Sequence, residues 1–140
     1  MIKLKILSVG KTKEKWLNDA CNEYIKRLTG SIQIESAWAK DDSQLVEWAQ
    51  KENGYLCLDP AGRLFSSEEF AHFLIQQWEK GGSRLTLIIG GAEGLPPSIK
   101  EKGTAISLSP LTFTHQITRL VLVEQVYRAI EIQKGSQYHK

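Results

Sequence analysis

A short apolar segment that ends in a cluster of glycines constrains the fold of this chain more than any other feature. Residues 84–89, Arg-Leu-Thr-Leu-Ile-Ile, are too few for a typical helix and are hydrophobic on both alternating faces. That pattern is typical of a strand in the middle of a parallel sheet. Three glycines within residues 90–94 follow at once, and Glu93 is the only ionisable group among them. Because open α/β sheets bind ligands at the carboxyl ends of their strands, this loop is a candidate site, although a tight turn without a ligand has the same pattern.

The rest of the chain alternates between strand and helix patterns. Strands are predicted at residues 2–8, 32–37, 55–58 and 105–107, and a turn at residues 59–62 closes the third of them. Helices are predicted at residues 14–30, after the capping residues 41–43, from Ser66 or Ser67 to Gly81, after Pro96, and over 115–134. This order predicts an α/β fold with a parallel sheet covered on both faces. A chain of 140 residues suits one domain, residues 1–140.

Composition narrows the class of protein. Hydrophobic residues make up 41% and charged residues 24%, which is ordinary for a soluble globular protein. Without a long apolar run or a signal peptide, the expected location is cytoplasmic, with no membrane contact. Cys21 and Cys57 have no Cys or His at metal-ligand spacing. They are therefore expected to be small buried side chains rather than a zinc pair or a disulfide.

The formal net charge of +2 is unevenly distributed. Residues 1–30 carry seven Lys or Arg and three Asp or Glu, and the remainder of the chain is slightly acidic. This basic end, which includes Lys11, is suited to steering RNA, and a solvated helix face explains it equally well. A nucleoside triphosphate site is disfavoured, because the first glycine of a phosphate-binding loop is replaced by Lys5 and the dinucleotide glycine motif is missing.

The last predicted helix is apolar round most of its circumference. Only a narrow strip containing Glu124, Arg128 and Glu131 is polar, so the helix must be buried on several sides and a subunit interface is expected. Arg119 and Arg128 lie on opposite sides of the predicted helix, about half a turn from each other around its axis. The helix therefore does not bring both to one site. Arg128 is also spaced for an ion pair with Glu124. The terminal segment 138–140, Tyr-His-Lys, is either a frayed end or a nucleic-acid contact in which Tyr stacks on a base.

Several motifs in order resemble one family from end to end. They are the strand ending Ser8-Val-Gly-Lys11, the loop Gly90-Gly-Ala-Glu-Gly94, Leu108-Ser-Pro-Leu-Thr-Phe-Thr-His115, Arg119, Glu124-Gln-Val-Tyr-Arg-Ala129 and Tyr138-His139-Lys140. Together they resemble the ribosomal large-subunit methyltransferase H family of the SPOUT class. The chain departs from the family's pattern at Ala92 and Thr114, where the family usually has proline, and at Lys140, where relatives often carry arginine.

The resemblance implies a small α/β domain whose C-terminal part forms a deep trefoil knot, in a homodimer. It also implies S-adenosylmethionine (SAM) as methyl donor, no metal, and methylation at N3 of a pseudouridine in 23S rRNA on the assembled ribosome. The implied donor site comprises Leu58, Gly90, Gly91, Gly94, Leu108, Ser109, Pro110, Leu111, Thr112 and Phe113.

The chemistry requires either a base that accepts the N3 proton or a cation that favours the anionic ring. Attack by an imide nitrogen needs loss of its proton, which a base or a nearby cation favours. The candidate catalytic residues are Glu93, His115, Arg128 and His139, although His115 is equally suited to a structural hydrogen bond. RNA contacts are expected from Lys11, Arg119, Tyr138, His139 and Lys140, with the tail supplied by the opposite subunit. The alternative function is a non-catalytic RNA-binding or ribosome-assembly factor, which would not bind SAM.

Overall fold

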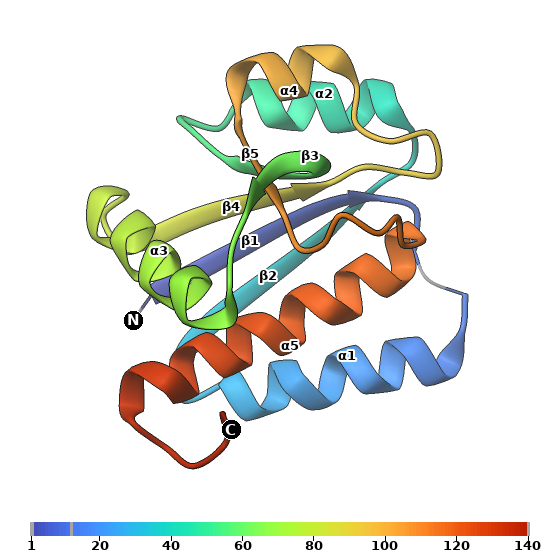
Figure 1. The fold of residues 1–140 in the computed structure, drawn as a ribbon. Coiled ribbons are helices and arrows are strands. Elements are labelled where there is room, and N and C mark those ends of the chain that lie inside the picture. Colours follow the sequence, from blue (N-terminus) through green and yellow to red (C-terminus); the bar gives the residue numbers. More distant parts are fainter. Residues whose placement is uncertain (1, 12, 140) are drawn as a thin grey trace.

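Five parallel strands form the sheet that the sequence predicts (Figure 1). The computed structural model describes residues 2–11 and 13–139. The strands are β1 (Ile2–Val9), β2 (Ile32–Ala39), β3 (Leu56–Leu64), β4 (Arg84–Ile89) and β5 (Thr104–Ser107), in the order β2-β1-β4-β3-β5. The helices are α1 (Lys15–Leu28), α2 (Asp42–Gln50), α3 (Ser67–Lys80), α4 (Pro97–Lys102) and α5 (His115–Lys134). The predicted α/β class and element order are confirmed.

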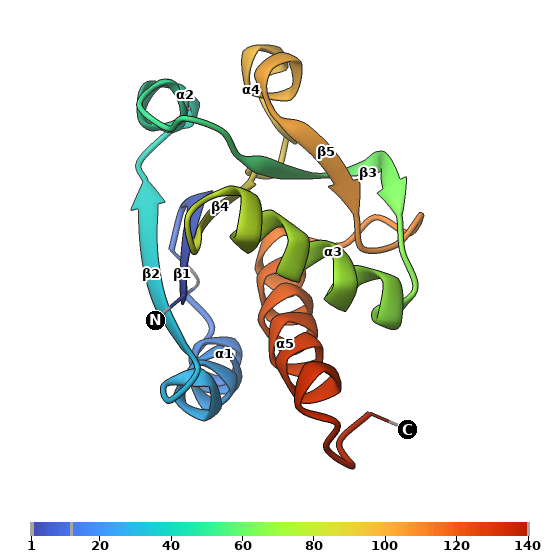
Figure 2. The same ribbon diagram turned by 90° about the vertical axis from the view of Figure 1, so that its left-hand side faces the viewer.

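Helices lie on both faces of the sheet. Figures 1 and 2 show α1, α3 and α5 on one side and α2 with α4 on the other. Each side has its own apolar cluster, one centred on residues such as Leu4, Ile6 and Leu122, and the other on residues such as Leu7, Leu45 and Ile88. Neighbouring residues of β1 thus face opposite layers, as the alternation of a strand requires. Cys21 and Cys57 are buried and unpaired, as predicted.

Short polar side chains fix where the long helices begin. Ser66 and Glu69 form a reciprocal capping box at the start of α3, and the Thr114 hydroxyl accepts a hydrogen bond from the Ile117 amide at the start of α5. Gly135 ends α5 at a φ of 71°, a conformation that glycine adopts without a steric penalty. His115 therefore lies at the carboxyl edge of the sheet, and the C-terminal tail begins at the opposite end of α5.

The third strand is longer than predicted. Residues 59–62 form an irregularity inside β3 rather than a turn that ends it, because Leu58 and Arg63 both pair with Ile106 of β5. A Cβ atom at Gly62 would lie 2.7 Å from the main chain of Ala105 and Ile106. The segment therefore bulges past the edge strand and returns, a position in which proline and glycine are tolerated. The predicted turn residues do interrupt the regular pairing, but the prediction that they end the third strand was wrong.

Helix α5 is buried on several sides, as its apolar circumference predicts. Its buried residues include Leu122, Val123 and Val126, and the helix packs against α1, α3 and the sheet. Much of this covering comes from the same chain, so the burial of α5 alone does not require a second subunit. The subunit interface stays a prediction.

Candidate functional site

The irregular segment of β3 and the loops that follow β4 and β5 enclose a cavity of about 320 Å³ at the carboxyl edge of the sheet. The three strands are neighbours in the sheet order. The volume is near the lower end for small-molecule sites, which span roughly 300–1,000 Å³. Of the predicted donor-binding residues, the cavity is lined by Leu58, Gly90, Gly91, Gly94, Leu108, Ser109, Leu111, Thr112 and Phe113, and Pro110 is not among its lining residues.

The glycine loop is shaped by contacts with itself. The Gly94 amide donates to the Gly91 carbonyl at 3.0 Å, and Gly94 has a φ of 84°. A Cβ atom at Gly90 would lie 2.7 Å from the main-chain carbon of Gly94. The sequence predicted that glycine here lets the main chain approach a ligand, and the structure adds a different reason at Gly90, which is the close approach of the loop's own backbone. The loop thereby closes one wall of the cavity.

Hydroxyl groups hold the loop that follows β5. The Ser107 hydroxyl donates to the Ser109 carbonyl at 2.8 Å and accepts from the Ser109 amide, and the Leu111 amide donates to the Ser109 hydroxyl at 3.0 Å. Local bonds of this kind replace regular secondary structure. They leave the apolar side chains of Leu108 and Phe113 on the cavity wall.

Asp59 is a cavity residue that the sequence interpretation missed. Its carboxylate accepts a hydrogen bond from the Ala61 amide at 3.0 Å and pairs with the Lys100 ammonium of α4 at 3.0 Å. The Ala61 amide, together with Lys100, holds the pKa of Asp59 below its ordinary value. A carboxylate directly after a buried strand at the binding edge was the available signal, and it was read only as part of a turn.

The depressed pKa of Asp59 predicts a pH dependence of stability. The contribution is complete above the unfolded pKa of about 3.9 and is lost as pH falls through the lower folded pKa. The Asp59→Asn substitution should therefore destabilise the protein at pH 6 by about 0.5–1 kcal/mol, the scale of a partly exposed ion pair. The difference from wild type should disappear near pH 2, as measured by urea unfolding at both pH values. An undiminished difference at the lower pH would contradict this assignment.

Two of the predicted catalytic residues lie on the cavity wall. Glu93 is an exposed member of the glycine loop, and His115 is the half-buried first residue of α5. Together with Asp59, Glu93 places a second carboxylate beside the cavity. Carboxylates on the wall of a cavity favour a ligand that carries positive charge.

Arg119 lies inside the protein rather than on an RNA-accessible surface. Only 6% of it is exposed, and its guanidinium donates to the hydroxyls of Ser8 at 3.2 Å and Ser36 at 2.5 Å. It also lies over the Trp38 ring, 4.7 Å from the centroid. Burial lowers the pKa of this guanidinium. The position argues against the predicted direct RNA contact and for a residue that joins α5 to β1 and β2.

The other predicted RNA-binding residues have different settings. Lys11 is exposed, and its ammonium lies over the Trp38 ring, 5.5 Å from the centroid. Lys140 lies outside the described residues. Within the basic N-terminal part, Lys15 pairs with Asp19 and Arg27 with Glu23 along α1. Those two cations therefore form part of a solvated helix face.

The C-terminal tail folds back onto Arg128. Glu124 accepts hydrogen bonds from the Arg128 guanidinium and from the Tyr138 hydroxyl, both at 2.9 Å. His139 contacts Arg128 through Nδ1 at 3.0 Å and Glu68 of α3 through Nε2 at 2.6 Å. Burial raises the pKa of Tyr138, and contacts with Tyr24 and Glu124 add to the shift. We name Glu124, Arg128, Tyr138 and His139 the tail cluster.

The first turn of α5, which lines the cavity, and the C-terminal tail lie at opposite ends of the helix (Figure 1). At a rise of 1.5 Å per residue, Arg128 lies about 20 Å along the helix from His115. The structure thus brings Glu93 and His115 together at the cavity and places Arg128 with His139 elsewhere. Within one chain the four predicted catalytic residues do not form a single site.

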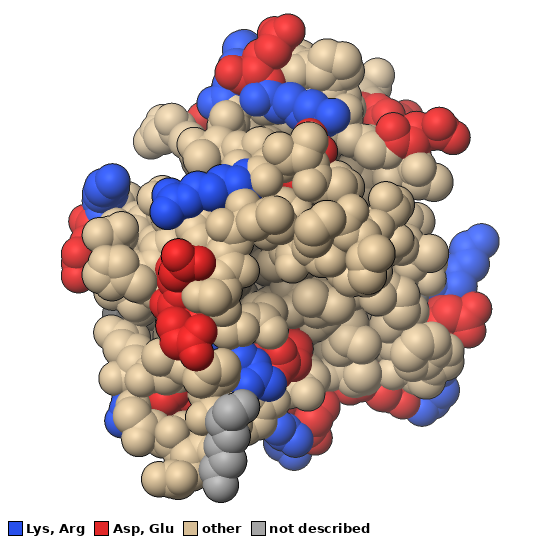
Figure 3. Space-filling model, viewed as in Figure 1, with Lys and Arg blue, Asp and Glu red and all other residues tan. Residues whose placement is uncertain are grey.

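Neither a metal centre nor a membrane span is found among the described residues. Within residues 2–11 and 13–139, no three His, Cys, Asp or Glu side chains gather as metal ligands. No helix in that part of the chain is long and apolar enough to cross a membrane. On the face seen in Figure 3, basic and acidic side chains are interspersed round a largely uncharged centre.

Comparison with known proteins finds relatives over the whole chain. The family model described as "Predicted SPOUT methyltransferase" matches residues 2–139. A ribosomal RNA large subunit methyltransferase H from Protochlamydia amoebophila is 67% identical over 140 residues and is aligned over 100% of both chains. The protein of that name from Streptococcus thermophilus is 40% identical over an alignment of 159 positions, which covers 99% of this chain and 100% of the relative.

Solved structures share the fold at low sequence identity. TrmJ from Z. mobilis ZM4 has a TM-score of 0.56 at 8% identity, over 92% of this chain and 70% of its own. A Legionella pneumophila protein in complex with bound SAM has a TM-score of 0.51 at 14% identity, over 92% of this chain and 66% of its own. At such identities the likeness concerns the arrangement of the parallel α/β sheet.

Proposed function

Since this chain belongs to the ribosomal RNA large subunit methyltransferase H family of SPOUT methyltransferases, we propose that it transfers a methyl group from SAM to N3 of a pseudouridine in 23S rRNA. The assembled ribosome in the cytoplasm is the proposed substrate. The observation that carries the proposal is the cavity at the carboxyl edge, where the irregular segment of β3 meets the loops after β4 and β5. A family of methyltransferases and a ligand-sized cavity at the expected edge support the same conclusion.

The residues round the cavity fit SAM. The apolar side chains of Leu58, Leu108 and Phe113 suit the adenosine, and Asp59 with Glu93 suits its positive charges. When bound, SAM supplies a methyl group made electrophilic by its sulfonium. This chain's part is then to bind and orient the donor and to exclude water from its surroundings.

Proton removal from N3 is the task left to the protein. Glu93 and His115 are the candidate bases on the cavity wall of the same chain. Arg128 would favour the anionic form of the target ring, because a fixed cation stabilises charge that develops in the transition state. His139, which contacts Arg128, is the third candidate for the proton.

A homodimer would unite these groups. One chain holds the donor cavity and the tail cluster about 20 Å apart along α5, so we propose that the tail cluster of one subunit meets the cavity of the other. Exposed apolar residues such as Trp16 at 59% and Leu111 at 70% suit such an interface. In this arrangement Tyr138 and His139 hold the RNA beside the donor.

The deep trefoil knot is likewise proposed for the C-terminal part. Gly62 approaches the main chain of β5 so closely that a Cβ atom would collide, and the chain then returns from β5 into α5, which packs between α1 and α3. This crossing supports a threaded path. A crystal structure traced through residues 104–115 would establish whether this segment passes through a loop formed by the rest of the chain.

The function is tested by binding and transfer measured separately. Titration calorimetry of the protein alone should detect saturable SAM binding, and radiolabelled SAM with ribosomes that lack the modification should label 23S rRNA. The labelled nucleotide is then located by mass spectrometry of RNA fragments. RNA binding without any SAM binding would instead support the alternative of a non-catalytic assembly factor.

A further inference from the structure

One half of a sheet face is left without a helical cover. Helices α2 and α4 pack over the carboxyl half of the face, around Leu7, Ala39 and Ile88. The amino-terminal half is open and forms a groove of about 710 Å³, which we name the sheet-face groove. Parallel sheets are almost always covered on both faces, so an uncovered half of this size invites a partner.

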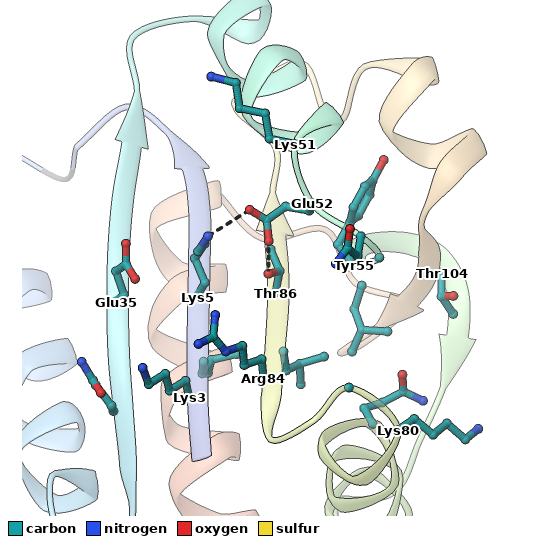
Figure 4. A pocket seen from close by; sticks show the side chains of 18 residues that line it. Lys3, Lys5, Glu35, Lys51, Glu52, Tyr55, Lys80, Arg84, Thr86 and Thr104 are labelled. Atoms are coloured by element: carbon teal, nitrogen blue, oxygen red, sulfur yellow. Dashed lines mark hydrogen bonds and ion pairs between the residues drawn. The ribbon is translucent and has the colours of Figure 1, made fainter. Parts of the chain in front are cut away.

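The residues of the groove lie in register across three strands (Figure 4). Gln33, Lys3 and Arg84 are partners in the first row of β2, β1 and β4. The second row consists of Glu35, Lys5 and Thr86, and the third row of Ala37, Leu7 and Ile88. The face therefore changes from polar to apolar at the point where the helices begin to cover it.

The lining of the groove carries excess positive charge. Its charged residues are Lys3, Lys5, Lys51, Lys80 and Arg84 against Glu35 and Glu52, a balance of +3, whereas the whole chain carries +2. The groove thus carries a net charge of +3, whereas the rest of the chain carries a net charge of −1. An anionic partner is favoured. The aromatic and large apolar residues of the lining are buried, which disfavours a protein partner; they are Leu4, Tyr55, Leu56 and Leu85.

Lys3 and Arg84 are directly opposite each other on neighbouring strands. Both are exposed, and neither takes part in an ion pair among the described residues. Like charges in this position destabilise a sheet. An anion bound across the two strands would remove that repulsion.

The middle of the groove is already neutralised and fixed in place. The Lys5 ammonium pairs with Glu52 at 2.9 Å, and the Thr86 hydroxyl donates to the other oxygen of Glu52 at 2.6 Å. These bonds tie the segment after α2 to β1 and β4. The lining cations outside any ion pair among the described residues are Lys3, Lys80 and Arg84. Lys3 and Arg84 lie side by side at the open end of the groove, and Lys80 extends from the end of α3 on the other side (Figure 4).

We propose that the sheet-face groove binds the phosphodiester backbone of the rRNA at a point away from the modified nucleotide. The inference rests on the proposed function for the class of substrate. Arg84 and Gly90 stand at opposite ends of β4, about 20 Å apart at 3.3 Å per residue, so this contact is separate from the donor cavity. Contacts to phosphate give affinity and orientation without reading a base.

The test compares variants of equal charge. Dissociation constants for large ribosomal subunits that lack the modification are measured without SAM over a range of salt concentrations. Lys3→Gln/Arg84→Gln should weaken binding about tenfold at low salt and reduce the salt slope by roughly 1.5, since each lost phosphate contact contributes about 0.7–0.9. The control Lys40→Gln/Lys102→Gln removes two exposed lysines outside the groove and should change binding less.

A third variant reverses the sign of the effect. Glu35→Gln removes an exposed carboxylate from the second row and should tighten binding several-fold. SAM affinity should stay close to wild type in all variants, because none of these side chains lines the donor cavity. The melting temperature should also change little, because the substituted side chains are exposed. A failure of methyl transfer by the wild type would count against the proposed function and would leave this comparison of affinities intact.

Equal affinity of the groove variant and its control would overturn the inference, and so would weaker or unchanged binding by Glu35→Gln. Loss of dimer in sedimentation of the groove variant, with RNA affinity retained, would also overturn it and would assign the face to a second copy of the chain.

Discussion

Truncation after Gly135 is expected to abolish methyl transfer while the protein still folds and binds SAM. The shortened chain loses the hydroxyl of Tyr138 on Glu124 and the His139 contact with Arg128. Loss of these groups should lower the transfer rate by about 100-fold or more, the scale of a missing proton-transfer or charge-stabilising group. The rate is measured with ribosomes and radiolabelled SAM, and SAM affinity by calorimetry.

The cost in stability should be small by comparison. Tyr138 contributes a hydrogen bond to Glu124 and an edge-on contact with Tyr127, whose ring centroids are 4.7 Å apart. Together these are worth about 1–2 kcal/mol. The His139 contacts with Arg128 and the exposed Glu68 add little. The control Gln137→Ala changes an exposed tail residue and should keep full activity. Full activity of the truncated chain would rule out any role of the tail in the reaction.

Gly90→Ala is expected to weaken SAM binding by about 100-fold or more, since a misplacement of about 1 Å in a binding loop is enough for such a loss. The added Cβ atom would lie 2.7 Å from the Gly94 carbon and 2.8 Å from the Leu95 nitrogen. Both are main-chain atoms, so the glycine loop itself must move. Calorimetry with SAM measures the effect directly.

The neighbouring glycine provides the control. A Cβ atom at Gly91 would meet only the Val9 side chain, at 3.4 Å, so Gly91→Ala should retain most of the affinity. Circular dichroism melts of both variants separate a displaced loop from a lost fold. If Gly90→Ala folds and binds SAM as well as Gly91→Ala does, the cavity has been assigned to the wrong ligand.

Most elements could be predicted because the residues within them determine where they begin and end. Apolar residues 84–89 became the central strand β4, the serine and threonine caps started their helices, and Gly135 ended α5. The irregularity in β3 was missed because it depends on β5, which is distant in sequence: Pro and Gly favour a turn, but pairing of Arg63 with Ile106 returns the chain to the sheet. Pairing between strands overrides local turn preference in such cases.

The candidate site was predictable where it follows the ends of strands. The loop after β4 and the loop after β5 meet at one edge because parallel strands end there, and Glu93 and His115 line a cavity at that edge. Their catalytic roles stay predictions. The burial of Arg119 depends instead on Ser8, Ser36 and Trp38, which its own helix gives no sign of. Lys100 likewise reaches Asp59 only through tertiary folding.

Complementation between two inactive variants tests the central claim, which is that a cavity in one subunit works with the tail cluster of the other. Differently tagged Gly90→Ala and truncated chains are co-expressed, and the mixed dimer is purified by both tags. Its donor cavity is intact in the truncated subunit and its tail is intact in the Gly90→Ala subunit. Recovery of rRNA methylation by the mixed dimer is the predicted result, whereas a mixed dimer that binds SAM and stays as inactive as its parents would contradict the shared site.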